Sequence, residues 1–177
     1  MSYQKGFAPI LIIIAVGIIG LAGAAGAALM GQAPVCPTEG TAARSEKEIG
    51  DTLDKSGSVN ITDGEATSLA GKYVAGKVQN TRVCFTSGLG HASGNIKLAS
   101  FSPSFYASAG VDLSGSTPKA TNLDIKVGSL PNVPVLSSQA ESFVTSLINE
   151  NLAKFALKKK YSAQFTQGSI TISKLSN

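Results

Sequence analysis

The chain has 177 residues, of which 43% are hydrophobic and 15% are charged, and its formal net charge is +4 at pH 7. An apolar N-terminal run and a polar stretch behind it leave about 120 residues, enough for one domain with its own hydrophobic core. The only basic cluster, at residues 158–160, ends a predicted helix, where cations favour the dipole, so we expect no nucleic-acid partner.

Residues 7–30 are all apolar, Gly or Pro, and as a helix of about 36 Å they can span a bilayer. Lys5 precedes this run and Glu39 is the first charge after it, so the positive-inside bias places residues 1–6 in the cytoplasm and the remainder outside. We therefore expect a single-pass anchor, or an uncleaved signal, with the lipid bilayer as its partner. A cleaved signal peptide stays open as an alternative, because residues 25–27 match the signal-peptidase pattern. The Gly- and Ala-rich anchor would also allow helix–helix association.

Lys5, Gly6 and Phe7 stand immediately before the apolar helix. This start resembles the leader of type IV prepilins, which is cut at the position between Gly6 and Phe7. The sequence departs from that family at Leu11, where the family normally has Glu. The resemblance implies an alternative function, as a pilin-like or other structural subunit of a cell-surface assembly.

Residues 31–60 contain two prolines, several Gly and Ser residues, and a charged stretch in which Ile49 and Leu53 are the only large apolar side chains. Such a composition buries little apolar surface. We interpret residues 31–60 as a flexible tether, with transient helix at most, and expect the extracytoplasmic domain to occupy residues 61–177.

The domain opens with a predicted helix over residues 63–75, because Thr62 and Glu65 have the spacing of a capping box and apolar residues recur behind them at helical spacing. The chain then becomes β-like. Val83 and Phe85 lie on one face of a strand, and a Gly-rich turn leads into a second strand. Residues 105–114 and 122–127 follow, each with a period of two that predicts one buried and one solvent-facing side.

A second capping box, Ser138 with Glu141, opens the strongest pattern in the chain. Apolar residues follow it at helical spacing for about five turns, so this helix must cover an apolar surface. Alternating residues on either side of a turn at 166–168 then predict a terminal hairpin. The predicted fold class is α+β: an N-terminal transmembrane helix, then about six antiparallel strands in a curved sheet packed on a long amphipathic helix and a short helix.

Catalytic and metal-binding patterns are absent from the sequence. His91 is the only histidine and is expected at the surface in a Gly-rich turn. One His and two Cys do not make a zinc set, and the acidic residues are scattered without a calcium-loop spacing. We therefore expect no enzyme activity, no metal and no cofactor.

Cys36 and Cys84 are the only cysteines. An even pair in a chain expected outside the cytoplasm allows a disulfide, which would pin the tether onto the early strands. Two free thiols, with Cys84 buried in its strand, are the alternative.

The segments NITDGEATSLAGKYV, TRVCF, GSLPNVPVLSS and QGSITIS follow one another between residues 60 and 173. This pattern resembles the small anchored envelope proteins of the YpmS and LmeA type, relatives of the tubular lipid-binding (TULIP) fold. In that family a curved sheet wraps a long helix, and the inner faces form an apolar groove for lipid chains. The resemblance implies a membrane-anchored extracytoplasmic binding module for lipid or a lipid-linked envelope component.

The groove walls that the resemblance implies are apolar residues of two predicted strands and of the long helix. They are Phe105, Val111, Leu113, Leu123, Ile125, Val127, Phe143, Leu147, Ile148, Leu152 and Phe155. The alternative for each of them is packing in an ordinary closed core.

Overall fold

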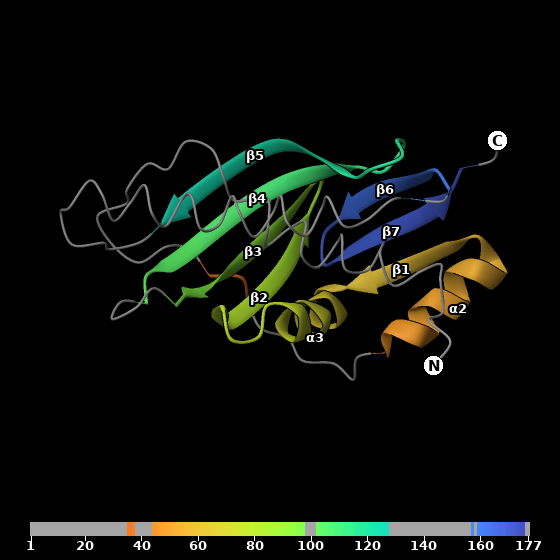
Figure 1. Cartoon of the computed structure of the whole chain (residues 1–177). Coiled ribbons are helices and arrows are strands. Elements are labelled where there is room, and N and C mark those ends of the chain that lie inside the picture. The colour runs from red at the N-terminus through yellow and green to blue at the C-terminus, as the bar shows by residue number, and fades with distance from the viewer. Residues whose placement is uncertain (1–34, 38–43, 98–101, 128–156, 158, 176–177) are drawn as a thin grey trace.

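The computed structural model describes residues 35–37, 44–97, 102–127, 157 and 159–175, and for Tyr73, Leu123, Ile125 and Val127 it describes the backbone alone. The described residues form an α+β domain of two short helices and seven antiparallel strands in two sheets (Figure 1). The α+β class predicted from the sequence is confirmed. The predicted anchor at 7–30 and the helix predicted behind Ser138 lie outside the described residues.

One sheet has four strands in the order β2-β3-β4-β5, each antiparallel to the next. Its strands are β2 (Val78–Thr86), β3 (Leu89–Ile96), β4 (Ser104–Asp112) and β5 (Lys119–Val127). All four strands were predicted, because each alternates or is bounded by Gly-containing turns. Gly88, between β2 and β3, has a φ of 83°, a conformation that glycine adopts without strain.

The other sheet has three strands in the order β1-β7-β6. Its strands are β1 (Ser58–Thr62), β6 (Tyr161–Thr166) and β7 (Ser169–Lys174). The hairpin of β6 and β7, with Gly168 at a φ of 79°, confirms the predicted terminal hairpin. β1 was not predicted, and it pairs with β7 from more than a hundred residues away in the sequence.

The two helices are α2 (Glu46–Ser56) and α3 (Asp63–Tyr73). In α3 the predicted capping box is present, since the Thr62 side chain accepts from the Glu65 amide and the Glu65 side chain accepts from the Thr62 amide. α2 begins with a second such box at Ser45 and ends at Gly57, whose N–H donates to the Leu53 carbonyl.

The prediction of a flexible tether is corrected where the structure describes residues 31–60. Residues 46–56 form α2 and residues 58–60 belong to β1. Ile49 and Leu53, one helical turn apart, are both 0% exposed, because they pack into the core beside β1. Two buried apolar side chains contribute several kcal/mol in total, at roughly 1.5–3 kcal/mol each, so a short polar helix stays folded here.

A single cluster of buried residues joins the two sheets and the two helices, with Phe85, Phe105 and Ile61 among its largest members. α3 packs beside β2, as Figure 1 shows, and supplies side chains to the open edge of that strand. The Val83 N–H donates to Thr67 Oγ1 at 2.9 Å, and the Phe85 N–H donates to Asp63 Oδ1 at 2.9 Å. The edge of β2 is thereby closed by polar side chains rather than by another strand.

Within the part of the chain that the structure describes, no helix is long and apolar enough to cross a membrane.

Candidate functional site

The face of the four-stranded sheet that turns toward the core carries those groove residues that the structure describes. Phe105 and Leu113 are each 1% exposed and belong to the buried cluster. Val111 is half-buried and packs against that cluster. The predicted alternation is confirmed on the core side of this strand, where Phe105, Ala107 and Ala109 are at most 1% exposed, but the side predicted to face solvent is covered, since Ser108 is only 8% exposed.

For the remaining predicted groove residues the structure describes only the backbone of those on β5. The register of β5 places Ile125 opposite Ala107 and Val127 opposite Phe105, so both positions lie on the same face as the core residues of β4. Leu123 lies where the β4–β5 register shifts. The predicted groove residues of the long helix lie outside the described residues; they are Phe143, Leu147, Ile148, Leu152 and Phe155.

Small residues form the middle of this apolar face. Ala92 of β3 pairs with Ala107 of β4, and Gly90 pairs with Ala109. Ala92, Ala107 and Ala109 are all 0% exposed. Small side chains leave the floor of the sheet low, so an apolar chain or a helix can approach its backbone closely.

Larger side chains flank that floor. In the register, Val83 stands beside Ala92 and Phe85 beside Gly90, both on β2. The Phe85 ring also meets the Phe165 ring of β6, with centroids 5.9 Å apart. We name the strip of Gly90, Ala92, Ala107 and Ala109, which Val83 and Phe85 flank on the β2 side, the alanine floor.

The chain returns to this region just after the predicted long helix. Leu157 is buried in the core, and its N–H donates to the Ser116 carbonyl at 2.8 Å, in the loop between β4 and β5. The Tyr161 N–H donates to the Leu113 carbonyl at 3.1 Å, which joins the start of β6 to the end of β4. The point of return is therefore fixed at one end of the four-stranded sheet.

The opposite face of the same sheet, which we call the outer face, holds the disulfide. Cys36 and Cys84 are bonded, with their Cα atoms 5.6 Å apart, so of the two alternatives left open by the sequence the structure has the disulfide. Cys36 also donates its N–H to Ser93 Oγ at 3.1 Å, and its carbonyl accepts from Arg82 Nη1 at 3.4 Å. A buried disulfide of this kind suggests an oxidising, extracytoplasmic environment.

His91 lies on the outer face beside Cys36. The expectation of a surface histidine is wrong. Its side chain is 8% exposed, and its two ring nitrogens bond the Thr86 hydroxyl at 2.6 Å and the Tyr106 hydroxyl at 2.8 Å. The ring also stacks on Tyr106. A neutral imidazole satisfies both hydroxyls as one donor and one acceptor, and burial lowers the pKa of His91. The cluster therefore fastens three strands together.

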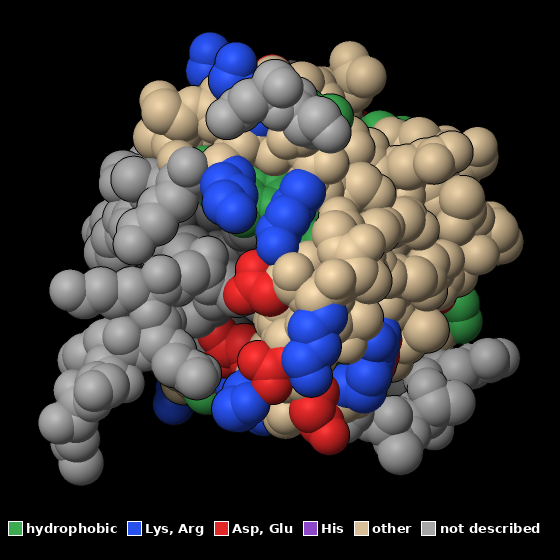
Figure 2. All heavy atoms as spheres, turned by 90° about the vertical axis from the view of Figure 1, so that its right-hand side faces the viewer, with side chains coloured by type: hydrophobic (Ala, Val, Ile, Leu, Met, Phe, Trp, Pro, Cys, Tyr) green, Lys and Arg blue, Asp and Glu red, His purple; other side chains and the backbone are tan. Residues whose placement is uncertain are grey.

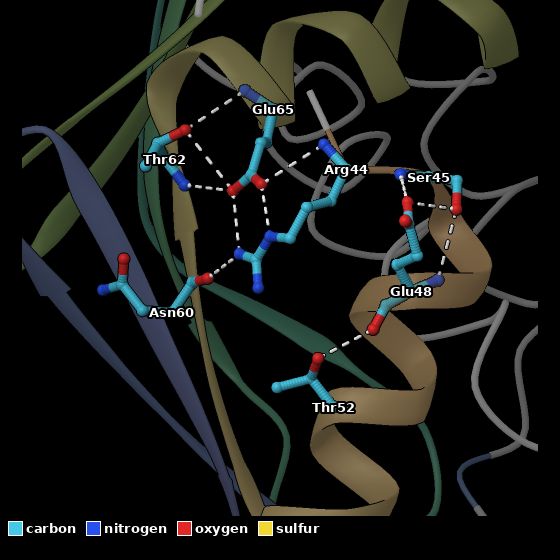
Figure 3. A network of polar contacts seen from close by, with 7 residues as sticks. All are labelled: Arg44, Ser45, Glu48, Thr52, Asn60, Thr62 and Glu65. Carbon is cyan, nitrogen blue, oxygen red and sulfur yellow. Dashed lines mark hydrogen bonds and ion pairs between the residues drawn. The ribbon is translucent and has the colours of Figure 1, made fainter. Parts of the chain in front are cut away.

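An ion pair joins the segment before α2 to the start of α3, as Figure 3 shows. The Arg44 guanidinium contacts both carboxylate oxygens of Glu65, with Nη2 3.0 Å from Oε2, and it also donates to the Asn60 carbonyl. The Glu65 side chain is 6% exposed, and its hydrogen bond with Arg44 is the main reason why its pKa is lowered. This pair is structural, because the same carboxylate caps α3.

Chemical groups for catalysis do not converge in the part of the chain that the structure describes. Among those residues no group of three or more His, Cys, Asp or Glu side chains could hold a metal ion. Charged side chains of both signs lie next to one another on the face that Figure 2 shows, rather than forming a field of one sign. The alanines of the alanine floor are 0% exposed and belong to the buried cluster.

The chain was compared with protein-family models, with curated proteins and with solved structures, and none of the three comparisons found a match.

Proposed function

We propose that the protein is a membrane-anchored extracytoplasmic module that binds a lipid, or a lipid-linked component of the envelope, over the alanine floor. The observation that carries the proposal is the floor itself, an apolar strip of small residues that Val83 and Phe85 flank on the β2 side. A site of that shape suits an acyl chain, which has no hydrogen-bonding groups and is held by apolar contact alone. The disulfide, which suggests an oxidising compartment, supports the extracytoplasmic part.

The positions of the described residues on either side of residues 128–156 add support. β5 ends at Val127, and the chain returns at Leu157, which bonds the loop before β5. Val127 and Leu157 therefore lie near opposite ends of β5. The nine residues of β5 extend about 30 Å at ~3.3 Å each, and the sequence-predicted helix from Ala140 to Ala156 would rise about 26 Å. A helix of that length matches the sheet.

On this proposal the apolar stripe of the predicted helix forms the second wall, and the lipid lies between that stripe and the alanine floor. The resemblance to the YpmS and LmeA type of envelope protein supports the same arrangement. The wall residues of the helix are those predicted from the sequence, with Leu147 near the middle of the stripe.

The test uses full-length protein with a protease site inserted between residues 31 and 34, so that the domain folds in its own membrane and is released afterwards. Native mass spectrometry of the released domain should show a bound lipid, and lipid extraction should identify it. A mass equal to that of the bare polypeptide would overturn the proposal. N-terminal sequencing of the membrane fragment gives a further reading, because a start at Phe7 would favour the pilin-like subunit.

Two matched variants locate the lipid. Leu147→Trp adds bulk on the apolar stripe and should lower the bound lipid at least severalfold. Ser146→Trp adds the same bulk to the neighbouring polar position and should leave the bound lipid unchanged. Equal lipid content in both variants would place the lipid elsewhere on the protein.

A further inference from the structure

Three basic side chains gather on the outer face of the four-stranded sheet, near the end where β2 begins and β3 ends. Lys77 and Lys97 lie one position beyond a buried pair of core residues, so the alternation of strand residues places both on the outer side. The Lys97 N–H donates to the Lys77 carbonyl at 3.0 Å, which holds the two residues beside each other. Arg82 reaches the same face, because its Nη1 donates to the Cys36 carbonyl there. We call Lys77, Arg82 and Lys97 the basic patch.

The basic patch carries a surplus of positive charge. Every charged residue between Glu65 and Asp112 in the sequence is basic. The ion pairs within the described residues involve none of the three members of the patch. At the same end of the sheet, Lys126 of β5 pairs with Asp124 at 3.7 Å, so that pair leaves the surplus unchanged. Both lysines of the patch are exposed and the arginine is partly exposed, so this charge reaches the solvent.

The chain that leads to the predicted anchor joins the domain on this same face. Cys36 is bonded to Cys84 of β2, and its carbonyl accepts from Arg82 of the patch. Figure 1 shows residues 35–37, in orange, against β2 and β3. Cys36 is six residues beyond the end of the predicted anchor, and six extended residues are shorter than the nine-residue strand β2. An anchor at residues 7–30 would therefore hold the outer face, rather than the core side, next to the bilayer.

The occupant that fits both observations is a bilayer surface with anionic headgroups. Each basic residue close to such a surface favours the docked state about fivefold, so the three residues of the patch favour it about a hundredfold. A soluble anionic partner would meet the same charges, but the short connection to the anchor places the patch beside lipid first.

We propose that the basic patch docks against anionic lipid headgroups and so turns the outer face of the sheet toward the bilayer. This inference rests on the membrane anchor of the proposed function, and it adds the orientation of the domain and the class of headgroup that the domain recognises. It does not depend on a lipid at the alanine floor, which lies on the other side of the same sheet.

The experiment measures how close the outer face lies to the bilayer in which full-length protein is anchored. Cys36 and Cys84 are bonded to each other, so a third cysteine is the only thiol that a dye can label. Gln79→Cys places the dye on the outer face beside the patch. Gln164→Cys places it at an exposed strand position of the three-stranded sheet and is the matched control. The labelled proteins are reconstituted in lipid nanodiscs that carry a spin-label quencher on some of the headgroups.

Two lipid compositions separate docking from simple tethering. In discs of equal parts phosphatidylcholine and phosphatidylglycerol, the dye at residue 79 should be quenched at least severalfold more strongly than the dye at residue 164. In discs of phosphatidylcholine alone, which has no net charge, most of that difference should disappear. Salt at about 1 M, where the Debye length is about 3 Å, should reduce the difference in the anionic discs in the same way.

Charge reversal tests the patch directly. Lys77→Glu combined with Lys97→Glu replaces one pair of like charges by another, so the repulsion between the two positions is unchanged while the attraction to anionic lipid becomes repulsion. The excess quenching at residue 79 should then be lost in anionic discs. Lys159→Glu combined with Lys160→Glu changes the net charge equally, at two exposed lysines before β6 and at the other end of the four-stranded sheet. This matched control should keep the excess quenching.

Three results would overturn the proposal while leaving the anchor intact. One is equal quenching at residues 79 and 164 in anionic discs. Another is the same excess at residue 79 in neutral and in anionic discs. The third is an equal effect of the two charge reversals while circular dichroism shows that both variants are folded. Protein that does not enter the discs at all would refute the anchor, and with it both this inference and the membrane part of the proposed function.

Discussion

Removal of the Cys36–Cys84 disulfide should destabilise the domain by about 4 kcal/mol. The bond closes a loop with a sequence separation of 48 residues, and the chain-entropy relation gives about 4 kcal/mol at 25 °C for a loop of that length. Cys36→Ser places a hydroxyl near the His91 carbonyl, since the sulfur that it replaces lies 3.7 Å from that oxygen. The double variant, Cys36→Ser with Cys84→Ser, should lose about as much as either single variant, since all three remove the same bond.

Urea unfolding of the released domain measures this loss. The chain has no tryptophan, so far-ultraviolet circular dichroism is the suitable signal. With a slope of about 2 kcal/mol per molar urea, the midpoint should fall by about 2 M. Wild-type protein unfolded with a reductant is the control, and it should match the double variant. The reasoning fails if the double variant stays within about 1 kcal/mol of wild type, or if the two single losses add.

Three further variants test the ion pair, the buried histidine and the core, each by the same unfolding measurement. Arg44→Met leaves the buried Glu65 carboxylate without its partner and should lower the free energy of unfolding by about 1–3 kcal/mol. Because the pKa of Glu65 is lowered in the fold, the stability that the ion pair contributes in wild-type protein is present above pH 4.5 and is lost as the pH falls through the folded pKa. An unchanged loss of stability at acid pH in the variant would refute this. Burial lowers the pKa of His91, so the unfolded chain binds the proton more tightly and stability should decline as the pH falls below 6.5. His91→Gln should remove that decline. If stability still declines with pH in the variant, another group causes it. Phe85→Ala empties a site that is 0% exposed and should lower stability by about 3–5 kcal/mol, whereas a loss below about 1 kcal/mol would mean that the site collapses.

Strong local patterns made most of the described fold predictable. α3 follows a capping box and an apolar stripe, and the strands of both hairpins alternate with Gly at their turns. These features depend on neighbours within a few residues, so the sequence displays them directly. The disulfide was predictable only as one of two alternatives, because pairing depends on where the fold brings Cys36.

α2 and β1 were missed for a related physical reason. The signal for α2 was present, since Ser45 and Glu48 have capping-box spacing and Gly57 provides the stop. Only two large apolar residues follow, however, and their burial depends on β1. β1 in turn is five residues long and gains its partner from β7 at the far end of the chain. Each element is too weak alone, and long-range pairing supplies the missing stabilisation.

His91 was misplaced because its surroundings come from distant segments. A Gly-rich turn usually lies at the surface, and β3 does begin beside such a turn. The ring becomes buried because Tyr106 of β4 stacks on it and the segment around Cys36 crosses the same face. Neither neighbour is visible in the local sequence. The Arg44–Glu65 pair was missed likewise, since the capping role of Glu65 already accounted for that residue.

The disulfide also limits the length of chain between the predicted anchor and the domain. If the anchor ends at residue 30, as the sequence predicts, Cys36 is six residues further along, so the distance between them is at most about 22 Å. With the bond broken, the Cys36 backbone keeps only its hydrogen bonds with Ser93 and Arg82 to hold this segment on the sheet. Energy transfer from a dye on β2 to labelled headgroups, with and without reductant, would measure the change. If residues 7–30 are an anchor, the oxidised bond therefore keeps Cys36 within about 22 Å of the end of that anchor.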